Sequence, residues 1–410
     1  MKNDKLRFGV NYTPSKKWLF SWVDWDRASI LEDLQAIAQM GMDHIRAHLL
    51  WPVFQPNNTY LSSSAMDRLE ELLDLAGQFG LDVEVTTLTG WICGYAHYPS
   101  WRWEENIFTN RKMIDAEKFL FLGIAERIGK HPNFMGFDLG NEIGMLNFTH
   151  NGNKISVEEG DLWFNEIMEH CEAVAPGKMH VNGVDHIPWF SDSSFTRKAL
   201  ANLGPVTSLH TWILFTGAMD LCKYSDVPCT HLGEYSIELA NAYSNQLERP
   251  VWMQEFGASK LWMPEEEMSW FAEQMIKNAA TCKNTWGFTW WCSHDIDRKY
   301  TEFNPLEYEM GLLDINNKVK PVGKRISELI REFKQNPPEV IERTIGLVLP
   351  EDLIGDKDRV QISKAFPGWN FAKPYFDLVA EGVRPSIVLE SRAEDVEYLK
   401  LRGIKELRRI

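Results

Sequence analysis

The feature that most constrains this chain is a regular alternation of short apolar segments with longer amphipathic ones. Eight apolar segments of strand length follow one another at intervals of roughly 25 to 50 residues. They span residues 6–13, 43–50, 81–88, 134–140, 179–184, 205–210, 249–255 and 285–292. Helical periodicity is clearest in residues 63–80, 116–133, 265–283 and 320–335, each of which follows such a segment. Eight strand–helix units predict an α/β fold, a closed (β/α)8 TIM barrel.

The main rival is a doubly wound open sheet, but no glycine-rich phosphate-binding motif opens the first helix. The pattern changes after residue 336, where NPPEV is typical of a linker. The remaining segments predict a small β-α-β-α unit, with its last part, residues 393–410, expected to be helical. We therefore expect a catalytic barrel over residues 1–335 and a C-terminal appendage over residues 336–410. The appendage would pack on the barrel or mediate contacts in a homo-oligomer.

Charge and composition exclude several classes of partner. The formal net charge of the 410 residues is −15, which argues against nucleic acid, because phosphate binding needs basic patches. The sequence contains no run of eighteen apolar residues that would predict a membrane span. The first residues also lack the apolar core of a signal peptide, so we expect a cytoplasmic protein. The six cysteines show no CxxC or zinc spacing and are expected to be reduced thiols. Seventeen tryptophans would suit ring-shaped ligands such as sugars.

Two glutamates end predicted strands of the barrel. Glu142 follows the fourth segment in GFDLGNEIG, and Glu255 closes the seventh in RPVWMQE. A carboxylate at the edge of an apolar core is unfavourable unless it is paired or has a function. Because the C-terminal ends of barrel strands surround one mouth, these glutamates would face each other there. Such a pair matches retaining glycoside hydrolysis, in which the two carboxyl groups lie about 5 to 5.5 Å apart.

Further polar and aromatic residues fall at the same mouth. They are Arg46 in the second segment, Asn141 beside Glu142, His210 and Trp212 at the end of the sixth, Trp291 in the eighth, and Trp91 after the third. In this strand order the set resembles clan A of the glycoside hydrolases, and within it family 5, the cellulase and mannanase family. The resemblance covers about residues 6–335 and does not reach the appendage.

The resemblance implies a role for each matching residue. Glu142 would be the acid/base and Glu255 the nucleophile, with Arg46 supporting Glu255. Asn141 would hold the 2-hydroxyl of the sugar. His210 would line the reacting subsite. Trp291, rather than its neighbour Trp290, would form the platform under the reacting sugar, and Trp91 and Trp212 would contribute to substrate binding. No metal or cofactor is implied.

The residues also allow plainer interpretations. Glu142 could belong to a surface ion pair, Arg46 to a structural ion pair, and His210 to the hydrogen-bonded core. Two departures from the family set this chain apart. Members commonly place a histidine near the end of strand 3, where this chain has only His97 in the following loop. They also carry a tyrosine that bonds the nucleophile where this chain has Trp212, which indicates a divergent subfamily.

For the substrate, a cytoplasmic enzyme of this kind would act on short oligosaccharides. Long loops after the third and sixth strands would close the groove to a pocket. We therefore expect an exo-acting β-mannosidase for short β-1,4-linked manno-oligosaccharides or mannosyl-N-acetylglucosamine. The alternatives are an endo-β-1,4-glucanase or endo-mannanase of the same family and, from another class, a non-catalytic carbohydrate-binding barrel.

Overall fold

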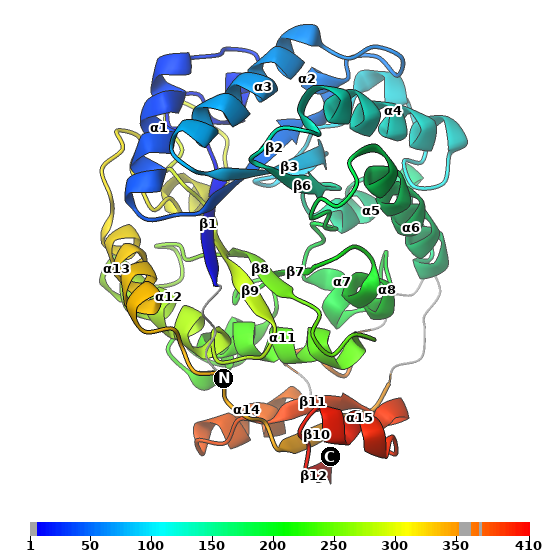
Figure 1. The fold of residues 1–410 in the computed structure, drawn as a ribbon, viewed down its shortest axis with the longest axis vertical. Helices are drawn as coiled ribbons and strands as arrows, with labels where there is room; N and C mark the ends of the chain where they lie inside the picture. Colours follow the sequence, from blue (N-terminus) through cyan, green and yellow to red (C-terminus); the bar gives the residue numbers. More distant parts are fainter. Residues whose placement is uncertain (1–5, 352–361, 369–370) are drawn as a thin grey trace.

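Seven parallel strands form the centre of the molecule. The computed structural model describes residues 6–351, 362–368 and 371–410. The strands run in the order β6-β3-β2-β1-β9-β8-β7. Their bounds are β1 (Arg7–Tyr12), β2 (His44–Leu50), β3 (Asp82–Thr89), β6 (Phe134–Asp138), β7 (Thr207–His210), β8 (Val251–Phe256) and β9 (Thr285–Trp290). They curl into a barrel that is surrounded by helices (Figure 1).

The segment at residues 179–184 completes the barrel without forming a regular strand. Only Val181 pairs with β6, as a parallel bridge to Asp138. Gly183 adopts a φ of +59°, a conformation that favours glycine. The side-chain oxygen of Asn182 accepts a hydrogen bond from the backbone N–H of Val184 at 2.9 Å. Toward β7, the Ser208 hydroxyl donates to the Asn182 side-chain oxygen at 3.0 Å. The prediction of a strand here was wrong in detail, but the (β/α)8 topology is confirmed.

Amphipathic helices cover the outside of the barrel. They are α1 (Arg27–Gln39), α3 (Ser63–Gln78), α4 (Arg111–Ile128), α6 (Val157–Val174), α8 (Arg197–Asn202), α11 (Leu232–Tyr243), α12 (Glu265–Ala279) and α13 (Pro321–Gln335). Side chains begin several of them: Ser62 caps α3, and Ser156 with Glu159 forms a capping box at α6. None of the helices in the described ranges is long and apolar enough to cross a membrane.

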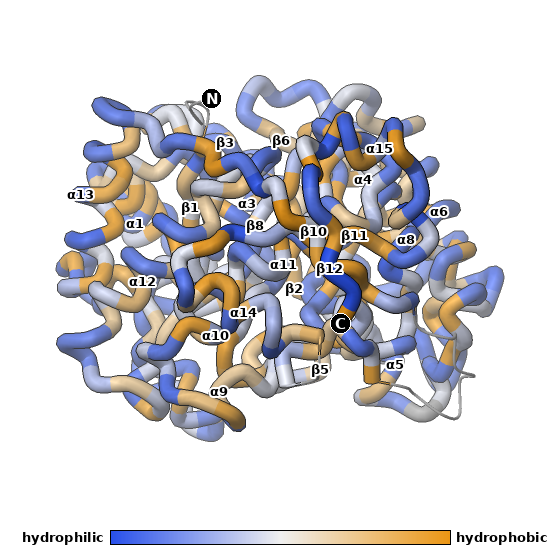
Figure 2. The backbone as a smooth tube through the Cα atoms, turned by 90° about the horizontal axis from the view of Figure 1, so that it is seen from below, coloured by the Kyte–Doolittle hydropathy of each residue, from blue (hydrophilic) through white to orange (hydrophobic). Residues whose placement is uncertain are grey.

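Short elements follow the strands. They are η1 (Trp18–Trp22), α2 (Trp51–Phe54), β4 (Trp91–Ile92), β5 (Tyr95–Ala96), η2 (Ser100–Arg102), η3 (Ile143–Met145), α5 (Leu146–Thr149), η4 (Asn151–Asn153), α7 (Ile187–Phe190), α9 (Ala218–Leu221), α10 (Val227–Thr230) and η5 (Pro305–Glu309). In Figure 2 the labels of β5, α5 and α9, which all follow barrel strands, lie toward the lower edge. The loops that follow the strands thus gather at one end of the barrel.

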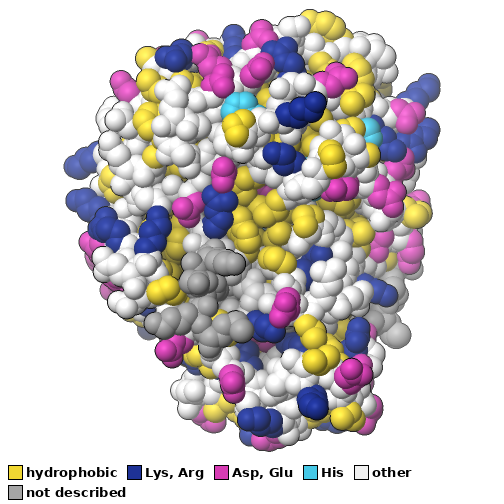
Figure 3. Space-filling model, in the orientation of Figure 1, with side chains coloured by type: hydrophobic (Ala, Val, Ile, Leu, Met, Phe, Trp, Pro, Cys, Tyr) yellow, Lys and Arg dark blue, Asp and Glu magenta, His cyan; other side chains and the backbone are white. Residues whose placement is uncertain are grey.

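Strand register sorts the barrel interior into polar and apolar levels. Asn11, Arg46 and Glu84 are in register on β1, β2 and β3, which places three polar side chains at one level. An apolar cluster forms near the N-terminal ends of the strands: Val181, Val206 and Trp252, with Met135, Met179 and Trp286 packed against them. Figure 3 shows hydrophobic side chains in the middle of one face, with charged side chains around them. Glu142 and Glu255, in contrast, lie after the end of β6 and near the end of β8, toward the loop-bearing end of the barrel.

The C-terminal residues form a second, three-stranded parallel sheet in the order β11-β10-β12. Its elements are β10 (Ile345–Leu349), α14 (Ala372–Ala380), β11 (Ser386–Leu389), η6 (Glu390–Arg392), α15 (Val396–Leu401) and β12 (Glu406–Arg409). The segment expected to be a final helix thus contains the short α15 followed by a strand, so the unit is β-α-β-α-β. It lies beside the barrel (Figures 1 and 2), with β11 against α11.

Candidate active site

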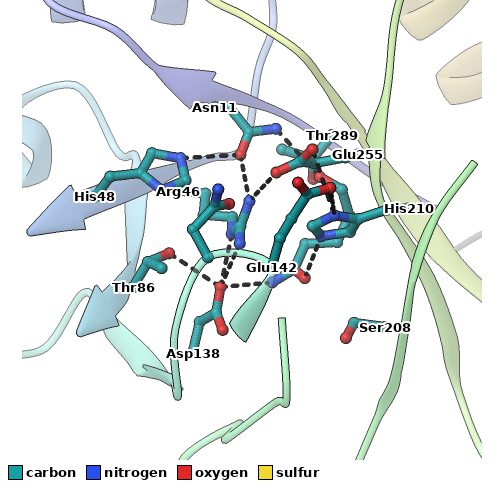
Figure 4. Close-up of polar contacts among 12 residues, drawn as sticks. Asn11, Arg46, His48, Thr86, Asp138, Glu142, Ser208, His210, Glu255 and Thr289 are labelled. Atoms are coloured by element: carbon teal, nitrogen blue, oxygen red, sulfur yellow. Dashed lines mark hydrogen bonds and ion pairs between the residues drawn. The ribbon is translucent and has the colours of Figure 1, made fainter. Parts of the chain in front are cut away.

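A pocket of about 510 Å³ lies where the barrel strands end. Its walls come from Glu255 in β8 and from the segments that follow β3, β6, residues 179–184, β7 and β9. Six of the residues expected at the mouth line it: Trp91, Asn141, Glu142, Trp212, Glu255 and Trp291. The other two, Arg46 and His210, lie beneath it and contact the glutamate pair (Figure 4). The fold thus brings all eight residues to one place.

Glu142 and Glu255 approach each other across this pocket. One carboxylate oxygen from each lies within 4.8 Å of the other and of a ring nitrogen of His210. Glu142 follows β6 in a left-handed backbone conformation, with φ 48° and ψ 46°, and its N–H donates to the Gly183 carbonyl at 2.8 Å. Non-glycine residues in this conformation are uncommon and concentrate at functional sites. The spacing suits the short carboxyl separation of retaining glycosidases.

Arg46 supplies positive charge beneath the pair. Its guanidinium is fully buried, and it donates to Glu255 Oε1 at 2.5 Å and to Asp138 Oδ2 at 2.8 Å. A further donation reaches the Asn11 side-chain oxygen at 2.9 Å, and the Glu84 carboxylate lies 3.8 Å away. Burial and the neighbouring Asp138 raise the pKa of Glu84 well above its ordinary value. Arg46 therefore favours the ionised form of Glu255, opposing the rise in its pKa caused by burial.

Trp212 provides a second donor to Glu255. Its indole Nε1–H donates to Glu255 Oε2 at 3.3 Å, the oxygen that Arg46 leaves free. The resemblance leads one to expect a tyrosine hydroxyl in this part of the site. An indole N–H can only donate, so Trp212 always presents hydrogen to the carboxylate. The substitution noted in the sequence thus keeps a hydrogen bond to Glu255.

Burial gives Glu142 the character of an acid. It raises the pKa of Glu142 to about 7, although Arg46 and a hydrogen bond from Trp91 act in the opposite direction. The pKa of Glu255 is also raised, by burial and by Glu142, while Arg46 opposes the rise. Two close carboxyl groups share a proton unequally, and the short Arg46 contact favours the charge on Glu255. The proton therefore belongs mainly on Glu142.

His210 is positioned to accept a hydrogen bond from the protonated carboxyl group of Glu142. Burial lowers the pKa of His210 to about 4, so its ring is neutral near pH 7. The side-chain nitrogen of Gln254 donates to Glu84 at 2.9 Å. The side-chain oxygen of Gln254 therefore faces His210 Nε2 at 3.3 Å, so Nε2 must carry a hydrogen and donate it. In a neutral ring Nδ1 is then an acceptor, and it lies 3.0 Å from Glu142 Oε1. This arrangement favours a protonated Glu142.

The remaining expected residues occupy the pocket walls. Asn141 donates from its side-chain nitrogen to the Trp91 carbonyl at 2.8 Å, and its side-chain oxygen has no partner among the described residues. Trp291 lines the pocket, whereas Trp290 is not among the lining residues and its indole donates to the Met310 carbonyl at 2.9 Å. A free amide oxygen and a tryptophan ring are thus available to a ligand.

Other residues of the site were not among those expected. Asp185 and Glu307 line the pocket, and each has one carboxylate oxygen without a partner among the described residues. Burial, then Glu142, raises the pKa of Asp185, and burial raises the pKa of Glu307 to about 7. Asp185 directly follows the fifth apolar segment, which already places it at the end of that strand, although the sequence gives it no role. Glu307 lies on the long loop after β9, where the sequence gives no periodic signal. His97 lies against Trp18 instead of lining the pocket.

Glu142, His210 and Glu255 are also the one group of potential metal ligands found in the described part of the chain. The donor set does not fit a cation well. Arg46 already places its charge 2.5 Å from Glu255, and a divalent ion there would meet that repulsion without relief. The arrangement is that of a carboxyl pair with a shared proton.

Comparisons with known proteins agree with this geometry. The family model described as cellulase (glycosyl hydrolase family 5) matches residues 8–177. A GH5_18 variant from Streptomyces cattleya, solved in complex with Manb1-4GlcNAc, is 34% identical with a TM-score of 0.93, covering 98% of each chain. A GH5_18 variant from Bifidobacterium longum subsp. longum, solved with the same ligand, is 31% identical with a TM-score of 0.91, covering 98% of this chain and 96% of that one.

A more distant structure shares the fold alone. The exo-beta-1,4-mannosidase Op5Man5 from Opitutaceae bacterium strain TAV5 is 21% identical with a TM-score of 0.79, covering 94% of this chain and 69% of that one. No curated protein matches the chain. The identity to the GH5_18 structures, over nearly the full length of both chains, shows that this chain belongs to glycoside hydrolase family 5.

Proposed function

We propose that this chain is a retaining, exo-acting β-mannosidase in which Glu142 is the acid/base and Glu255 the nucleophile. Glu142 donates its proton to the glycosidic oxygen while Glu255 Oε2 attacks the anomeric carbon and displaces the aglycone. Glu142, now ionised, then takes a proton from water, which attacks the same carbon and releases Glu255. The observation that carries this proposal is the pair of carboxyl groups, whose oxygens lie within 4.8 Å of each other across the pocket.

The surrounding groups fit these roles. Arg46 and Trp212 hold Glu255 ionised and oriented. The unpartnered side-chain oxygen of Asn141 can accept the 2-hydroxyl of the sugar, and Trp291 offers a ring for it to pack on. Nδ1 of His210 lies 3.0 Å from Glu142 Oε1 and 3.4 Å from Glu255 Oε2. It can therefore accept a hydrogen bond from whichever carboxyl group holds the proton.

A closed wall on one side of the pocket supports exo action. The β4–β5 hairpin meets the loop after β9, where the Tyr95 hydroxyl donates to the Glu302 carbonyl. Phe303 fills the junction, with ring centroids 5.3 Å from Tyr95 and 4.9 Å from Trp18. An endo-acting enzyme needs an open groove on both sides of the reacting sugar. This wall therefore favours release of a terminal sugar over cleavage within a polymer.

The sugar is proposed from the relatives. The GH5_18 structures at 34% and 31% identity were solved with Manb1-4GlcNAc, and this chain keeps their overall fold. We therefore propose mannosyl-β-1,4-N-acetylglucosamine or short β-1,4-manno-oligosaccharides as substrate, met in the cytoplasm. A cellulase-like endo-glucanase, an endo-mannanase or a sugar-binding barrel without turnover remain the alternatives that experiment should separate.

Covalent labelling tests the mechanism. A 2-deoxy-2-fluoro β-mannoside with a good leaving group should trap a glycosyl-enzyme on Glu255, seen by mass spectrometry of the peptide that contains it. The Glu255→Gln variant is the control and should take no label. Sugar binding by a wild-type protein that takes no label would identify a binding protein instead. A panel of manno-, cello- and chito-oligosaccharides and mannosyl-N-acetylglucosamine, with products identified, tests the substrate; monosaccharide release should continue in EDTA.

A further inference from the structure

The pocket has two ends, and different groups mark them. After residues 179–184 and β7, Asp185, His186 and Phe215 form one end, with the His186 and Phe215 rings stacked 6.3 Å apart. After β3 and β9, Cys93 and Glu307 form the other end. Glu142 influences the pKa of Asp185 more strongly than Glu255 does, so the first end lies on the acid's side. The leaving group, which the acid protonates, departs toward that end.

Glu307 lies at the opposite end, against the closed wall. It belongs to η5, a few residues after Phe303, whose ring seals the hairpin to the loop. Its carboxyl group faces Cys93 and Trp291, and these contacts only partly offset the rise in its pKa caused by burial. Oε2 of Glu307 is buried and has no hydrogen-bond partner among the described residues. A buried acceptor without a donor is unfavourable, so this oxygen is available to a ligand hydroxyl.

Glu307 does not belong to the reacting group. The cluster whose carboxylate and imidazole atoms lie within 4.8 Å contains Glu142, His210 and Glu255 alone in the described chain. A third carboxyl group at the blind end can serve the substrate only through hydroxyls far from the anomeric carbon. In a six-membered sugar these are the 4-hydroxyl, on the ring carbon opposite the anomeric carbon, and the neighbouring 6-hydroxyl, on the exocyclic carbon attached to C5.

We propose that Glu307 accepts a hydrogen bond from the free 4-hydroxyl of the terminal sugar and thereby makes an unsubstituted non-reducing end a requirement for turnover. The inference rests on the proposed function and adds to it the residue that enforces exo specificity. A sugar linked through its 4-position has no proton to donate and would extend into the wall formed by Phe303 and Tyr95. A site built to bond a hydroxyl discriminates strongly against an analogue that lacks it.

The test compares 4-nitrophenyl β-mannoside with its 4-deoxy analogue in four proteins. These are the wild type, Glu307→Ala, Glu307→Gln and Glu309→Gln. Glu309 lies on the same η5 but pairs with Lys260 and Arg298, so Glu309→Gln is a matched control. The wild type should lose roughly 10- to 100-fold in kcat/KM on the deoxy substrate. Glu307→Ala should lose a similar factor on the hydroxy substrate and little more on the deoxy one, whereas Glu309→Gln should match the wild type.

Each outcome is distinguishable. Equal losses for Glu307→Ala on both substrates, or a wild type that does not distinguish them, would overturn the inference. Labelling of Glu255 by the fluorinated mannoside and an unchanged melting temperature would show that the variant is folded. If Glu307→Ala does not fold, Glu307→Gln, whose amide oxygen is a weaker acceptor than a carboxylate, must show a smaller loss of discrimination in the same direction. A wild type inactive on every β-mannoside would instead contradict the proposed function.

Discussion

Glu255 accepts a hydrogen bond from Arg46 on one oxygen and from Trp212 on the other, and both donors orient it and favour its ionised form. If it is the nucleophile, Glu255→Ala should reduce kcat by several orders of magnitude, since no other carboxylate can form the glycosyl-enzyme. Azide should restore part of the activity by entering the space of the lost side chain. The product, identified by NMR, should be a glycosyl azide of inverted configuration. Retained hydrolysis without azide would contradict the assignment.

The pKa of Glu142, about 7, sets the alkaline side of the pH profile. The acid must hold its proton, so kcat/KM should fall as the pH rises through about 7 and the fraction of protonated Glu142 decreases. Glu142→Ala should abolish this alkaline limb. It should also slow cleavage of a natural disaccharide far more than that of a 2,4-dinitrophenyl glycoside, whose leaving group needs no proton. Equal losses on both substrates would rule out the acid role.

Substitution of Trp212 tests how Glu255, the proposed nucleophile, is kept ionised. Trp212→Phe removes one hydrogen bond to a charged group, worth about 1.5 to 3 kcal/mol, while it keeps most of the ring. We expect a fall in kcat of roughly 10- to 100-fold. The acid limb of the profile should move to higher pH, because Glu255 would protonate more easily. Thr216→Val, on the same loop but bonded to the Trp212 carbonyl at 2.8 Å, serves as control and should keep the limb in place.

Among individual residues, most of the candidate site could be predicted from the sequence, for a physical reason. Glu142, Glu255 and Arg46 are charges inside or directly after apolar strands, and burial makes such positions conspicuous. Glu307 is different, because it lies on an irregular loop where a glutamate is ordinary. Only the three-dimensional path of that loop brings its carboxyl group to Cys93 and Trp291.

Among the elements, strands were more predictable than the connections between them. Apolar runs indicated seven regular strands correctly, whereas residues 179–184 carry the same pattern and pair with β6 mainly through Val181. Gly136 contributes to this pairing, because a side chain there would lie 2.2 Å from the Met179 carbonyl oxygen. The β4–β5 hairpin has only two residues in each strand, too few for any periodic signal. Yet this hairpin closes the pocket.

The junction between the hairpin and the β9 loop offers a test of exo action. Phe303→Ala should loosen the wall by removing ring contacts with Trp18 and Tyr95. We expect a lower melting temperature, because large-to-small core substitutions of phenylalanine cost about 3 to 5 kcal/mol. Activity on substrates that carry a further sugar on the 4-position should rise relative to activity on mannosyl-N-acetylglucosamine. Leu306 lines the pocket beyond this junction, and Leu306→Met, as control, should leave the ratio unchanged.

For the whole molecule, the boundary near residue 336 and a role in homo-oligomers stay predictions; measurement of the mass in solution tests the latter. The structure adds a contact that no sequence pattern indicated. Arg343, just before β10, donates to Glu234 Oε1 of α11 at 2.7 Å and to the Pro385 carbonyl at 3.2 Å. Its Nε also lies 3.3 Å from Glu238 Oε1, so one buried cation links two carboxylates of the barrel to the C-terminal sheet.

This link makes the stability of the two parts interdependent. Arg343→Ala would leave Glu234 and Glu238 buried without their main cation, a loss of about 3 to 5 kcal/mol for a broken buried pair. We expect a clearly lower melting temperature and, in the wild type, one unfolding transition for barrel and appendage together. A control, Arg408→Ala, removes an exposed arginine of the appendage that pairs with Glu406 on the same strand, and should change the melting temperature little.

The effect of Arg343→Ala should depend on pH in a defined direction. Burial would raise the pKa of Glu234, but Arg343, His231 and Arg384 outweigh it and hold the pKa below its ordinary value. A carboxyl group whose pKa is lowered by folding stabilises the protein above its unfolded pKa, about 4.3, and loses that contribution as the pH falls below it. The difference in melting temperature between wild type and Arg343→Ala should therefore be full at pH 7 and shrink at pH 3. A difference that is equal at both pH values would mean that packing of the arginine stem, and not its charge, joins the appendage to the barrel.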